Sequence, residues 1–420
     1  MKYWIWAGAL ASSAALGFPA QAQSTPGVDV ESLLVIARER NPELASALRE
    51  ADAAAERVGP AGALPDPRVR TELLDVTKGN AQNPTLQPSR SGSARYTFIQ
   101  DVPWLGKRDL KRDAAQSEAN SIRSRADAAW REIAFKVKSA HAGLFYLSQA
   151  ESIARESLDL SASLEQVAQS RYAGGLVAQQ DVIRSQVEKT NLRAELIGWA
   201  AEMRQQRVRM NALLGRPSSS ELEPPKTIRA TPNPSQLNFD ALLDRARQRS
   251  PTLQADEAKL RASEQGRDLT YMNRYPDFTV GLAPNQTQNS FKQWDVMVEI
   301  SIPLQQSTRR SQERESEAIV KAVQSRREAT ENQISSELAE NVSALIAAKQ
   351  LEALASNALL PQAELNFKSA LSGYEAGKVD FATLLDAQRQ IRQARQSLVK
   401  AQSESLMRLA DIERLIGEDL

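Results

Sequence analysis

The stretch Gln293–Leu304, QWDVMVEISIPL, places its bulky apolar side chains at every second position. The apolar set is Trp294, Val296, Val298, Ile300 and Ile302, and the intervening positions hold Asp295, Met297, Glu299 and Ser301. A period of two is that of a β-strand, in which successive side chains point to opposite faces. The stretch therefore predicts a strand with one apolar face.

Three weaker alternating stretches accompany it, at 69–73, 94–100 and 278–282. They predict two hairpins, 68–104 and 277–304, with loops near Lys78–Arg90 and Ala283–Ser290. Strands of this length with one apolar face suit a transmembrane β-barrel, and Trp104 and Trp294 suit its interfacial girdles. A small soluble sheet packed on helices is the alternative. Because four strands cannot close a barrel that needs roughly eight, the barrel interpretation requires an oligomer.

The chain repeats its own plan at an offset of about 200 residues, which indicates an internal duplication. The matched segments are Leu33–Leu44 with Leu242–Leu253, Asp101–Trp104 with Ser301–Leu304, Arg171–Gly175 with Gly373–Gly377, and Leu213–Gly215 with Leu415–Gly417. We expect a first repeat over 23–215 and a second over 239–420. The proline-rich linker 216–238 joins them.

Most of each repeat is predicted to be a long helical hairpin, at 108–214 and 306–416. Apolar and small residues recur there at spacings of three and four, as in a coiled coil: Ala115, Ala119, Ile122, Ala126, Ala129, Ile133, Val137, Ala140, Leu144 and Leu147. A helix from Arg108 to Ala173 would be about 100 Å long at 1.5 Å per residue. Pro361 should kink its counterpart in the second repeat.

Each long helix ends at a Tyr-x-x-Gly turn, Tyr172–Gly175 or Tyr374–Gly377, remote from the strands. Asp181 and Asp386 follow these turns, and Asp386 lies three residues after Thr383, the position that matches Asp181. In a symmetric assembly each aspartate would form a ring of carboxylates, which can gate a pore or select cations. The alternative is two solvated aspartates paired with Arg184 and Arg389.

Residues 1–22 read as a cleaved signal peptide, with Lys2, an apolar run and a small-residue site ending at Ala22. The apolar run is shorter than the ~20 residues that a membrane anchor needs. The chain has no cysteine, and its acidic and basic residues balance, so neither a thiolate site nor nucleic-acid binding is expected. His141, the single histidine, is interpreted as a packing residue. No enzymatic site, metal site or cofactor is predicted.

The duplicated plan, with its Tyr-x-x-Gly turns and Leu-x-Gly ends, resembles the TolC family of outer-membrane efflux proteins over essentially the whole mature chain. The resemblance implies a mainly α fold with a β-barrel, in which three protomers form a 12-stranded barrel and a 12-helix coiled-coil tunnel. It also implies a passive gated duct in the outer membrane of a Gram-negative bacterium, in contact with outer-membrane lipid and with a large periplasmic part. An inner-membrane RND pump and a periplasmic membrane-fusion adaptor would complete the tripartite system.

By the same resemblance, the pore-gate positions are Asp181, Thr383 and Asp386, with Thr383 standing where the family has an acid. The adaptor would dock on the tips through Arg171, Tyr172, Gly174, Gly175, Tyr374, Gly377 and Lys378. The segment Gln100–Arg108 is similar to the cation-efflux branch that includes CzcC and CusC, which favours metal cations over organic compounds as cargo. The alternative function is a periplasmic coiled-coil adaptor or scaffold, which would need no lipid-facing strands.

Overall fold

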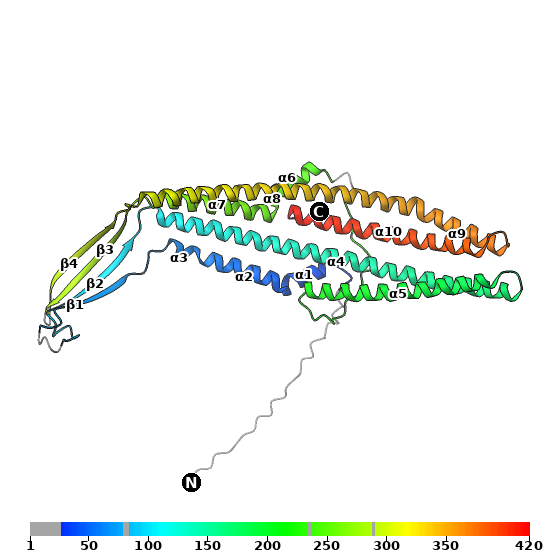
Figure 1. Cartoon of the computed structure of the whole chain (residues 1–420), viewed down its shortest axis with the longest axis horizontal. Coiled ribbons are helices and arrows are strands. Elements are labelled where there is room, and N and C mark those ends of the chain that lie inside the picture. Colours follow the sequence, from blue (N-terminus) through cyan, green and yellow to red (C-terminus); the bar gives the residue numbers. More distant parts are fainter. Residues whose placement is uncertain (1–26, 79–83, 233–236, 288–289) are drawn as a thin grey trace, which may run out of the picture.

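The structure is a computed structural model that describes residues 27–78, 84–232, 237–287 and 290–420. The predicted signal peptide, 1–22, lies outside these ranges, as do parts of the predicted linker and of both predicted hairpin loops. The chain forms an elongated layer of helices with a small sheet at one end and two helical tips at the other (Figure 1).

The first half contains α1 (Val30–Arg40), α2 (Pro42–Glu56), α3 (Val58–Gly62), α4 (Lys107–Ala173) and α5 (Gln179–Leu213). The second contains α6 (Phe239–Arg249), α7 (Pro251–Met272), α8 (Gln306–Leu354), α9 (Leu360–Glu375) and α10 (Phe381–Ile416). The short helices divide where the sequence predicts, since proline opens both α2 and α7. Asn41 caps α2 through a 3.0 Å bond from the Leu44 N–H to its Oδ1.

The sheet is fully antiparallel, in the order β1 (Arg68–Leu74), β2 (Ser93–Val102), β3 (Asp277–Thr287) and β4 (Ser290–Ser301). The expected loop at Ala283–Ser290 is wrong, because Ala283–Thr287 continue β3 and pair with β4. Polar contacts hold this extension, including a 2.6 Å bond from Asn285 Nδ2 to Asp295 Oδ2. The hydrophobic alternation ends at Leu282 and so gives no sign of it.

One face of the sheet is apolar and exposed, and the other carries the charges. The exposed apolar side chains are Val69, Phe98, Val280, Leu282, Trp294, Val296, Val298 and Ile300. On the other face Arg68 bonds Asp101 at 2.9 Å and Arg95 bonds Asp295 at 3.3 Å. β1 and β4 are the two edges, and within the described residues neither has a second neighbour.

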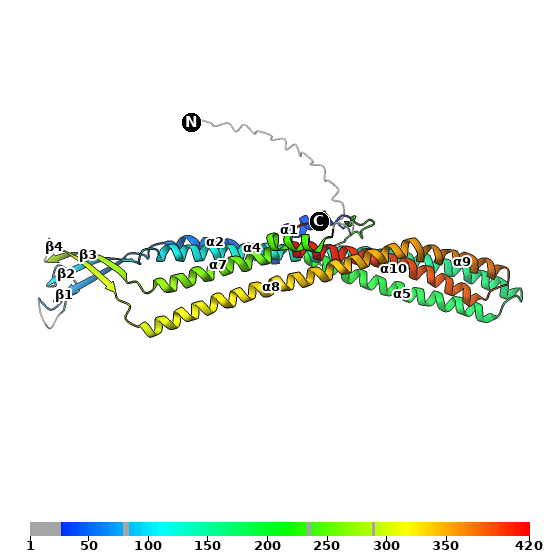
Figure 2. The ribbon, with the colours of Figure 1, turned by 90° about the horizontal axis from the view of Figure 1, so that it is seen from above.

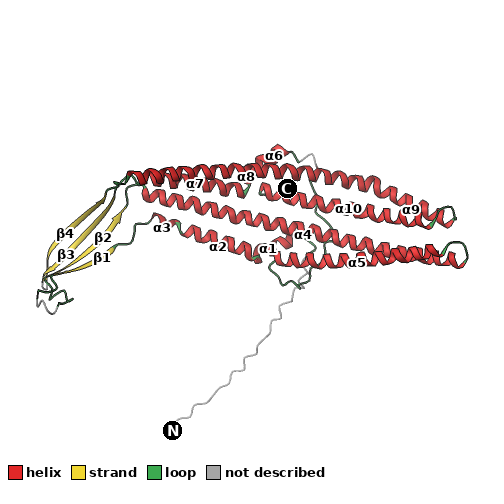
Figure 3. Ribbon diagram, in the orientation of Figure 1, coloured by secondary structure: helices red, strands yellow, loops and turns green. Residues whose placement is uncertain are grey.

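The helices form one layer with the same order along its length. Near the sheet, α2 packs on α4, α4 on α7 and α7 on α8; near the tips, α5 packs on α4, α4 on α10, and α10 on α8 and α9. Figure 2, seen from above, and Figure 3 show α4 and α8 passing from one region into the other. None of the helices in the described ranges combines the length and apolarity needed to cross a bilayer.

Small side chains dominate the centre of the layer. Ala119, Ala126, Ala140 and Ala154 on α4 are all buried, which lets neighbouring helices approach closely. Larger apolar residues gather in two clusters at the waist, where the short helices meet the long ones. Ile133 and Leu144 lie in the first cluster, and Leu338 and Leu345 in the second.

The second long helix is interrupted before Pro361, as the sequence predicts. A π-helical segment, η2 (Ala355–Leu359), separates α8 from α9, and Pro361 lies in the first turn of α9. Proline removes one backbone donor and crowds the carbonyl four residues earlier, and the π-helical segment lies directly before it, where the regular α-helical bonding is interrupted.

Candidate functional site: the tips and the waist

The two tips turn through glycines with positive φ, Gly175 at +71° and Gly377 at +69°. Each turn is closed by a backbone bond, from the Leu176 N–H to the Arg171 carbonyl at 2.9 Å and from the Lys378 N–H to the Gly373 carbonyl at 2.8 Å. Glycine is the residue that adopts this conformation at no steric cost. The sequence therefore determines both turns locally.

Arg171 joins the first tip to the second. Its Nη1 donates to the carbonyls of Tyr374 at 2.6 Å and Glu375 at 3.1 Å, and its guanidinium lies 4.8 Å from the Tyr374 ring centroid. The Tyr374 ring is buried and lies 5.3 Å from the ring of Phe381. The structure thus brings Arg171 and Tyr374 together. Tyr172, Gly174, Gly175, Gly377 and Lys378 stay exposed at the tips.

Asp181 lies in the first turn of α5 and is partly buried. Burial raises the pKa of its carboxyl, and the charge of Asp380 adds to this while Arg184 opposes it. The pKa of Tyr374 is raised by burial and by the charge of Asp181. Residues of both hairpins therefore share one electrostatic environment at the tips.

Thr383 and Asp386 are both exposed on the first turns of α10. Thr383 completes a cap, because its N–H and hydroxyl donate to Asp380 Oδ1 at 2.9 and 2.5 Å. These bonds lower the pKa of Asp380. Asp386, whose side chain is 65% exposed, accepts from Arg389 at 3.4 Å. Within one protomer, Asp386 is thus a solvent-exposed aspartate in contact with Arg389, as the alternative to a gate role expects.

Glu188 was missed by the sequence reasoning. Its side chain is 3% exposed and lies between α5 and α10, where it accepts from Arg389 Nη2 at 2.6 Å and Arg392 Nη1 at 3.2 Å. A signal was present, since Glu188 occupies the same helical face of α5 as the buried Ser185 and Leu192. An acid at such a position implies a cationic partner on a neighbouring helix.

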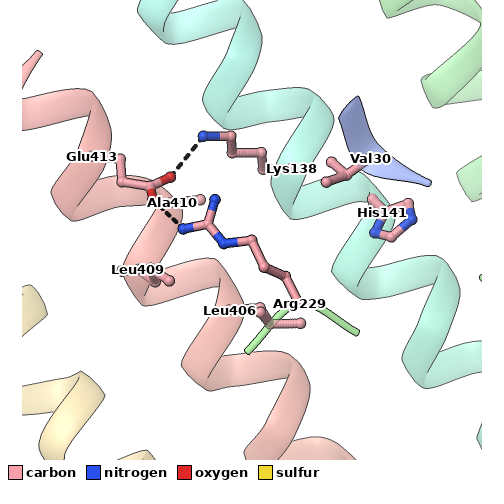
Figure 4. Close-up of a pocket in the computed structure, with 8 residues that line it drawn as sticks. All are labelled: Val30, Lys138, His141, Arg229, Leu406, Leu409, Ala410 and Glu413. Atoms are coloured by element: carbon pink, nitrogen blue, oxygen red, sulfur yellow. Dashed lines mark hydrogen bonds and ion pairs between the residues drawn. The ribbon is translucent and has the colours of Figure 1, made fainter. Parts of the chain in front are cut away.

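A second charged cluster lies at the waist, around a small cavity of 40 Å³ (Figure 4). Glu413 of α10 is almost fully buried and accepts from Lys138 Nζ of α4 at 2.7 Å, from the Leu420 N–H at 3.0 Å, and from Arg229. Lys138 also contacts Asp419 at 2.5 Å. We call Glu413, Lys138, Arg229 and Asp419 the waist cluster; it joins the first long helix, the segment between the repeats and the last helix.

His141 lines the same cavity but faces the N-terminal segment, with Nε2 3.4 Å from the Val28 carbonyl. Its side chain is buried, as expected for a packing residue. Burial lowers its pKa, although the Val28 carbonyl and the charge of Asp29 oppose this.

The sequence profile described as "Outer membrane efflux protein" matches this chain twice, over residues 33–216 and 242–418. The chain belongs to the outer membrane efflux protein family. Both matches together span most of the chain, one in each half. Membership decides between the two functions that the sequence left open, in favour of an efflux protein of the outer membrane and against a periplasmic scaffold.

The chain is also similar to individual known proteins, in sequence or in fold. The chain is 26% identical over 409 residues to the cobalt-zinc-cadmium resistance protein CzcC of Cupriavidus metallidurans, covering 95% of this chain and 92% of that one. Its fold matches CusC with a TM-score of 0.79 at 16% identity, over 95% of this chain and 96% of that chain. VceC of Vibrio cholerae matches with a TM-score of 0.78 at 19% identity, over 93% and 96%.

Proposed function

We propose that three copies of this chain form a continuous export duct, a 12-stranded barrel in the outer membrane followed by a periplasmic tunnel of helices. The observation that carries this proposal is the four-stranded sheet, which has an exposed apolar face and two edge strands without a further strand partner among the described residues. A sheet edge exposes unpaired N–H and C=O groups, and a membrane tolerates these only in a closed barrel.

The strand directions suit closure by further copies. The order β1-β2-β3-β4 alternates in direction, so β4 of one copy can pair antiparallel with β1 of the next. The charged face, with Arg68, Arg95, Asp101 and Asp295, would then line the lumen. The number three comes from the likeness to trimeric TolC-type channels.

The partners are an inner-membrane RND pump that supplies the energy and a periplasmic adaptor that docks on the tips. We place the docking surface at Arg171, Tyr172, Gly174, Gly175, Tyr374, Gly377 and Lys378. Asp181, Thr383 and Asp386 lie just behind these tips, so in a threefold assembly their side chains would form rings at the narrow end.

We propose divalent metal cations as cargo. The support is the relative from Cupriavidus metallidurans, which is named for resistance to cobalt, zinc and cadmium. Within the described residues no group of three or more His, Asp or Glu side chains is placed to hold a metal ion.

The test of the duct pairs a lipid-facing substitution with a lumenal one. Val298→Arg on the exposed apolar face should cost about 2–4 kcal/mol of barrel stability near the bilayer midplane, and should reduce the outer-membrane trimer. Glu299→Gln, the next residue on the opposite face, is the matched control and should assemble normally. Normal assembly of Val298→Arg would overturn the barrel. For the cargo, a strain lacking this protein should be hypersensitive to cobalt, zinc or cadmium and not to organic toxicants.

A further inference from the structure

The two connections that lead from the sheet into the long helices carry exposed apolar side chains. One connection runs from β2 to α4 and the other from β4 to α8, and both lie at the same end of the sheet (Figure 1). Leu105 is 86% exposed, Leu304 80% and Ile302 69%. Since these residues follow directly on the exposed apolar face of the sheet, that face extends to the first turns of α4 and α8.

Aromatic rings mark the edge of this apolar surface. Trp104 stacks on Phe278, a residue of the apolar face of β3, with ring centroids 5.7 Å apart, and on Tyr275 at 5.2 Å. Asp277 fixes the position of Trp104, because the Trp104 N–H donates to its Oδ1 at 2.8 Å. Tryptophan and tyrosine collect where a membrane protein passes from hydrocarbon to water. The boundary of the lipid-facing surface therefore lies at Trp104 and Tyr275.

Basic side chains follow this boundary in both repeats. The segments 104–112 and 302–310 together contain six lysines and arginines and one acid, Asp109, although the whole chain has 53 basic and 52 acidic residues. The basic residues are Lys107, Arg108, Lys111, Arg112, Arg309 and Arg310. Positive charge is therefore concentrated at one level of the molecule, next to the apolar surface.

Two of these cations have carboxylate partners. Lys107 is buried and lies 2.8 Å from Asp277, and Arg112 lies 3.1 Å from Asp113. The other four make no ion pair in the part of the chain that the structure describes, and we call them the basic collar: Arg108, Lys111, Arg309 and Arg310. Their charges are available to anions from outside the chain.

Arg309 also borders a polar cavity of 320 Å³, which Lys107, Gln305 and Thr308 help to line. Its Nη1 donates to the Asn273 carbonyl, but its Nε is buried without a hydrogen-bond partner among the described residues. A buried donor without an acceptor is unfavourable, so an anionic oxygen in this cavity would stabilise it.

The depth of the collar matches that of lipid headgroups. Lys111 lies four residues after the start of α4 at Lys107, and Arg310 four residues after the start of α8 at Gln306. At 1.5 Å per residue, both are about 6 Å beyond the ends of their helices that face the sheet. The headgroup layer on each side of a bilayer is about 5–8 Å thick. With the hydrocarbon boundary at Trp104, both cations lie within that layer.

We propose that the basic collar binds the phosphate groups of anionic phospholipids in the outer-membrane leaflet that faces the periplasm. The acyl chains would lie over Leu105 and Leu304 and continue onto the apolar face of the sheet. Positive charge next to an apolar surface matches a phospholipid, which presents a phosphate and hydrocarbon together, better than a free anion. The proposal rests on the outer-membrane barrel proposed above.

The test measures which lipid contacts Trp104. Every variant carries Trp294→Phe, and Trp130 and Trp199 pack in the core at the waist, so quenching by bilayer lipid reports Trp104. The purified protein is reconstituted in phosphatidylcholine bilayers that contain dibrominated phosphatidylglycerol or dibrominated phosphatidylcholine as quencher. We expect phosphatidylglycerol to be preferred about fivefold or more, because each Lys or Arg near an anionic surface contributes about that factor.

The variants separate the collar from net charge. Lys111→Gln/Arg310→Gln should lose most of the preference, whereas Lys111→Arg/Arg310→Lys should keep it because the collar recognises charge. The matched control, Arg326→Gln/Lys368→Gln, removes one lysine and one arginine from exposed positions. Arg326 lies 20 residues after the start of α8, about 30 Å further from the bilayer, and Lys368 lies further still. The control should keep the full preference.

Three results would overturn the collar and leave the duct intact, provided that the protein is recovered as an outer-membrane trimer. The first is equal quenching by both lipids when the collar is unchanged. The second is an undiminished preference in Lys111→Gln/Arg310→Gln, and the third is an equal loss in the Arg326 and Lys368 control. If the protein forms no oligomer in the outer membrane, the proposed function itself fails.

Discussion

Replacing Glu413 with glutamine should destabilise the protein more than the same replacement of a nearby surface glutamate would. Glu413 is 3% exposed and receives hydrogen bonds from Lys138, Arg229 and the Leu420 N–H. Removing one partner of a buried ion pair typically costs about 3–5 kcal/mol, because the other charge stays buried and unpaired. Here Lys138 retains Asp419 at 2.5 Å, and Arg229 retains the backbone oxygen of Leu420 at 3.1 Å. Because both partners keep a second acceptor, we expect a smaller loss than this range, about 2–3 kcal/mol.

The matched control is Glu418→Gln, five residues along the same end of the chain. Glu418 is 22% exposed, far more than Glu413, and its partners Arg245 and Arg249 are 52% and 63% exposed. Exposed pairs contribute about 0–1 kcal/mol, so this change should be nearly neutral. Unfolding of the purified protein in detergent can be followed by the fluorescence of Trp130 and Trp199, which pack against the neighbouring waist core.

A double-mutant cycle separates the ion pair from a general effect of losing charge. Lys138→Met combined with Glu413→Gln removes both buried charges, so the double variant should be more stable than the sum of the single changes implies, by about 1 kcal/mol or more. Equal losses for Glu413→Gln and Glu418→Gln, or strict additivity in the cycle, would refute the view that the waist cluster stabilises the junction of the two repeats.

Three further outcomes follow from the tips and the waist. Asp181→Asn and Asp386→Asn should each change the single-channel conductance or cation selectivity in planar bilayers, and unchanged currents in both would leave only the solvated-surface interpretation. Gly377→Val places a branched side chain at φ +69°, at a cost of about 1–3 kcal/mol, so export should fall while trimers still form; Gly266→Val, in a helix with open space around it, is the control. Burial lowers the pKa of His141 from 6.5, so the folded state binds a proton at this residue less readily than the unfolded state does. The free energy of unfolding should therefore be retained above pH 6.5 and decline as the pH falls below it. His141→Gln should remove this step from pH-dependent unfolding curves.

Local signals in the sequence were sufficient for the long elements. The helix expected from Arg108 to Ala173 is observed as Lys107–Ala173, because heptad spacing, the absence of proline and a terminal glycine all act within a few residues. The proline-opened helices and the two glycine turns follow from the same kind of signal. The end of β3 does not, because residues 283–287 are held by cross-strand polar contacts such as Asn285 with Asp295, which have no hydrophobic period.

The charged contacts between the hairpins could not be predicted from the sequence, because they too join residues that are distant along the chain. Glu188 and its partners Arg389 and Arg392 are about 200 residues apart, and only the packing of α10 near α5 brings them together. The waist cluster likewise combines a helix, a linker residue and the last turn of the chain. The capping role of Asp380 could have been predicted from the sequence, because an aspartate directly before a helix commonly accepts a hydrogen bond from the backbone N–H three residues later.

The shared arginine affects how the proposed gate should be understood. Arg389 contacts Asp386 on the exposed side at 3.4 Å and Glu188 on the buried side at 2.6 Å. The buried contact is the stronger of the two, because it is shorter and far less accessible to solvent. Asp386→Asn therefore leaves the link between α5 and α10 in place, and any change in current it causes reports the charge of Asp386 itself. Glu188→Gln removes the charge of that contact and so weakens it while Asp386 stays charged. The two variants therefore separate a charge that selects ions from a contact that holds the hairpins together.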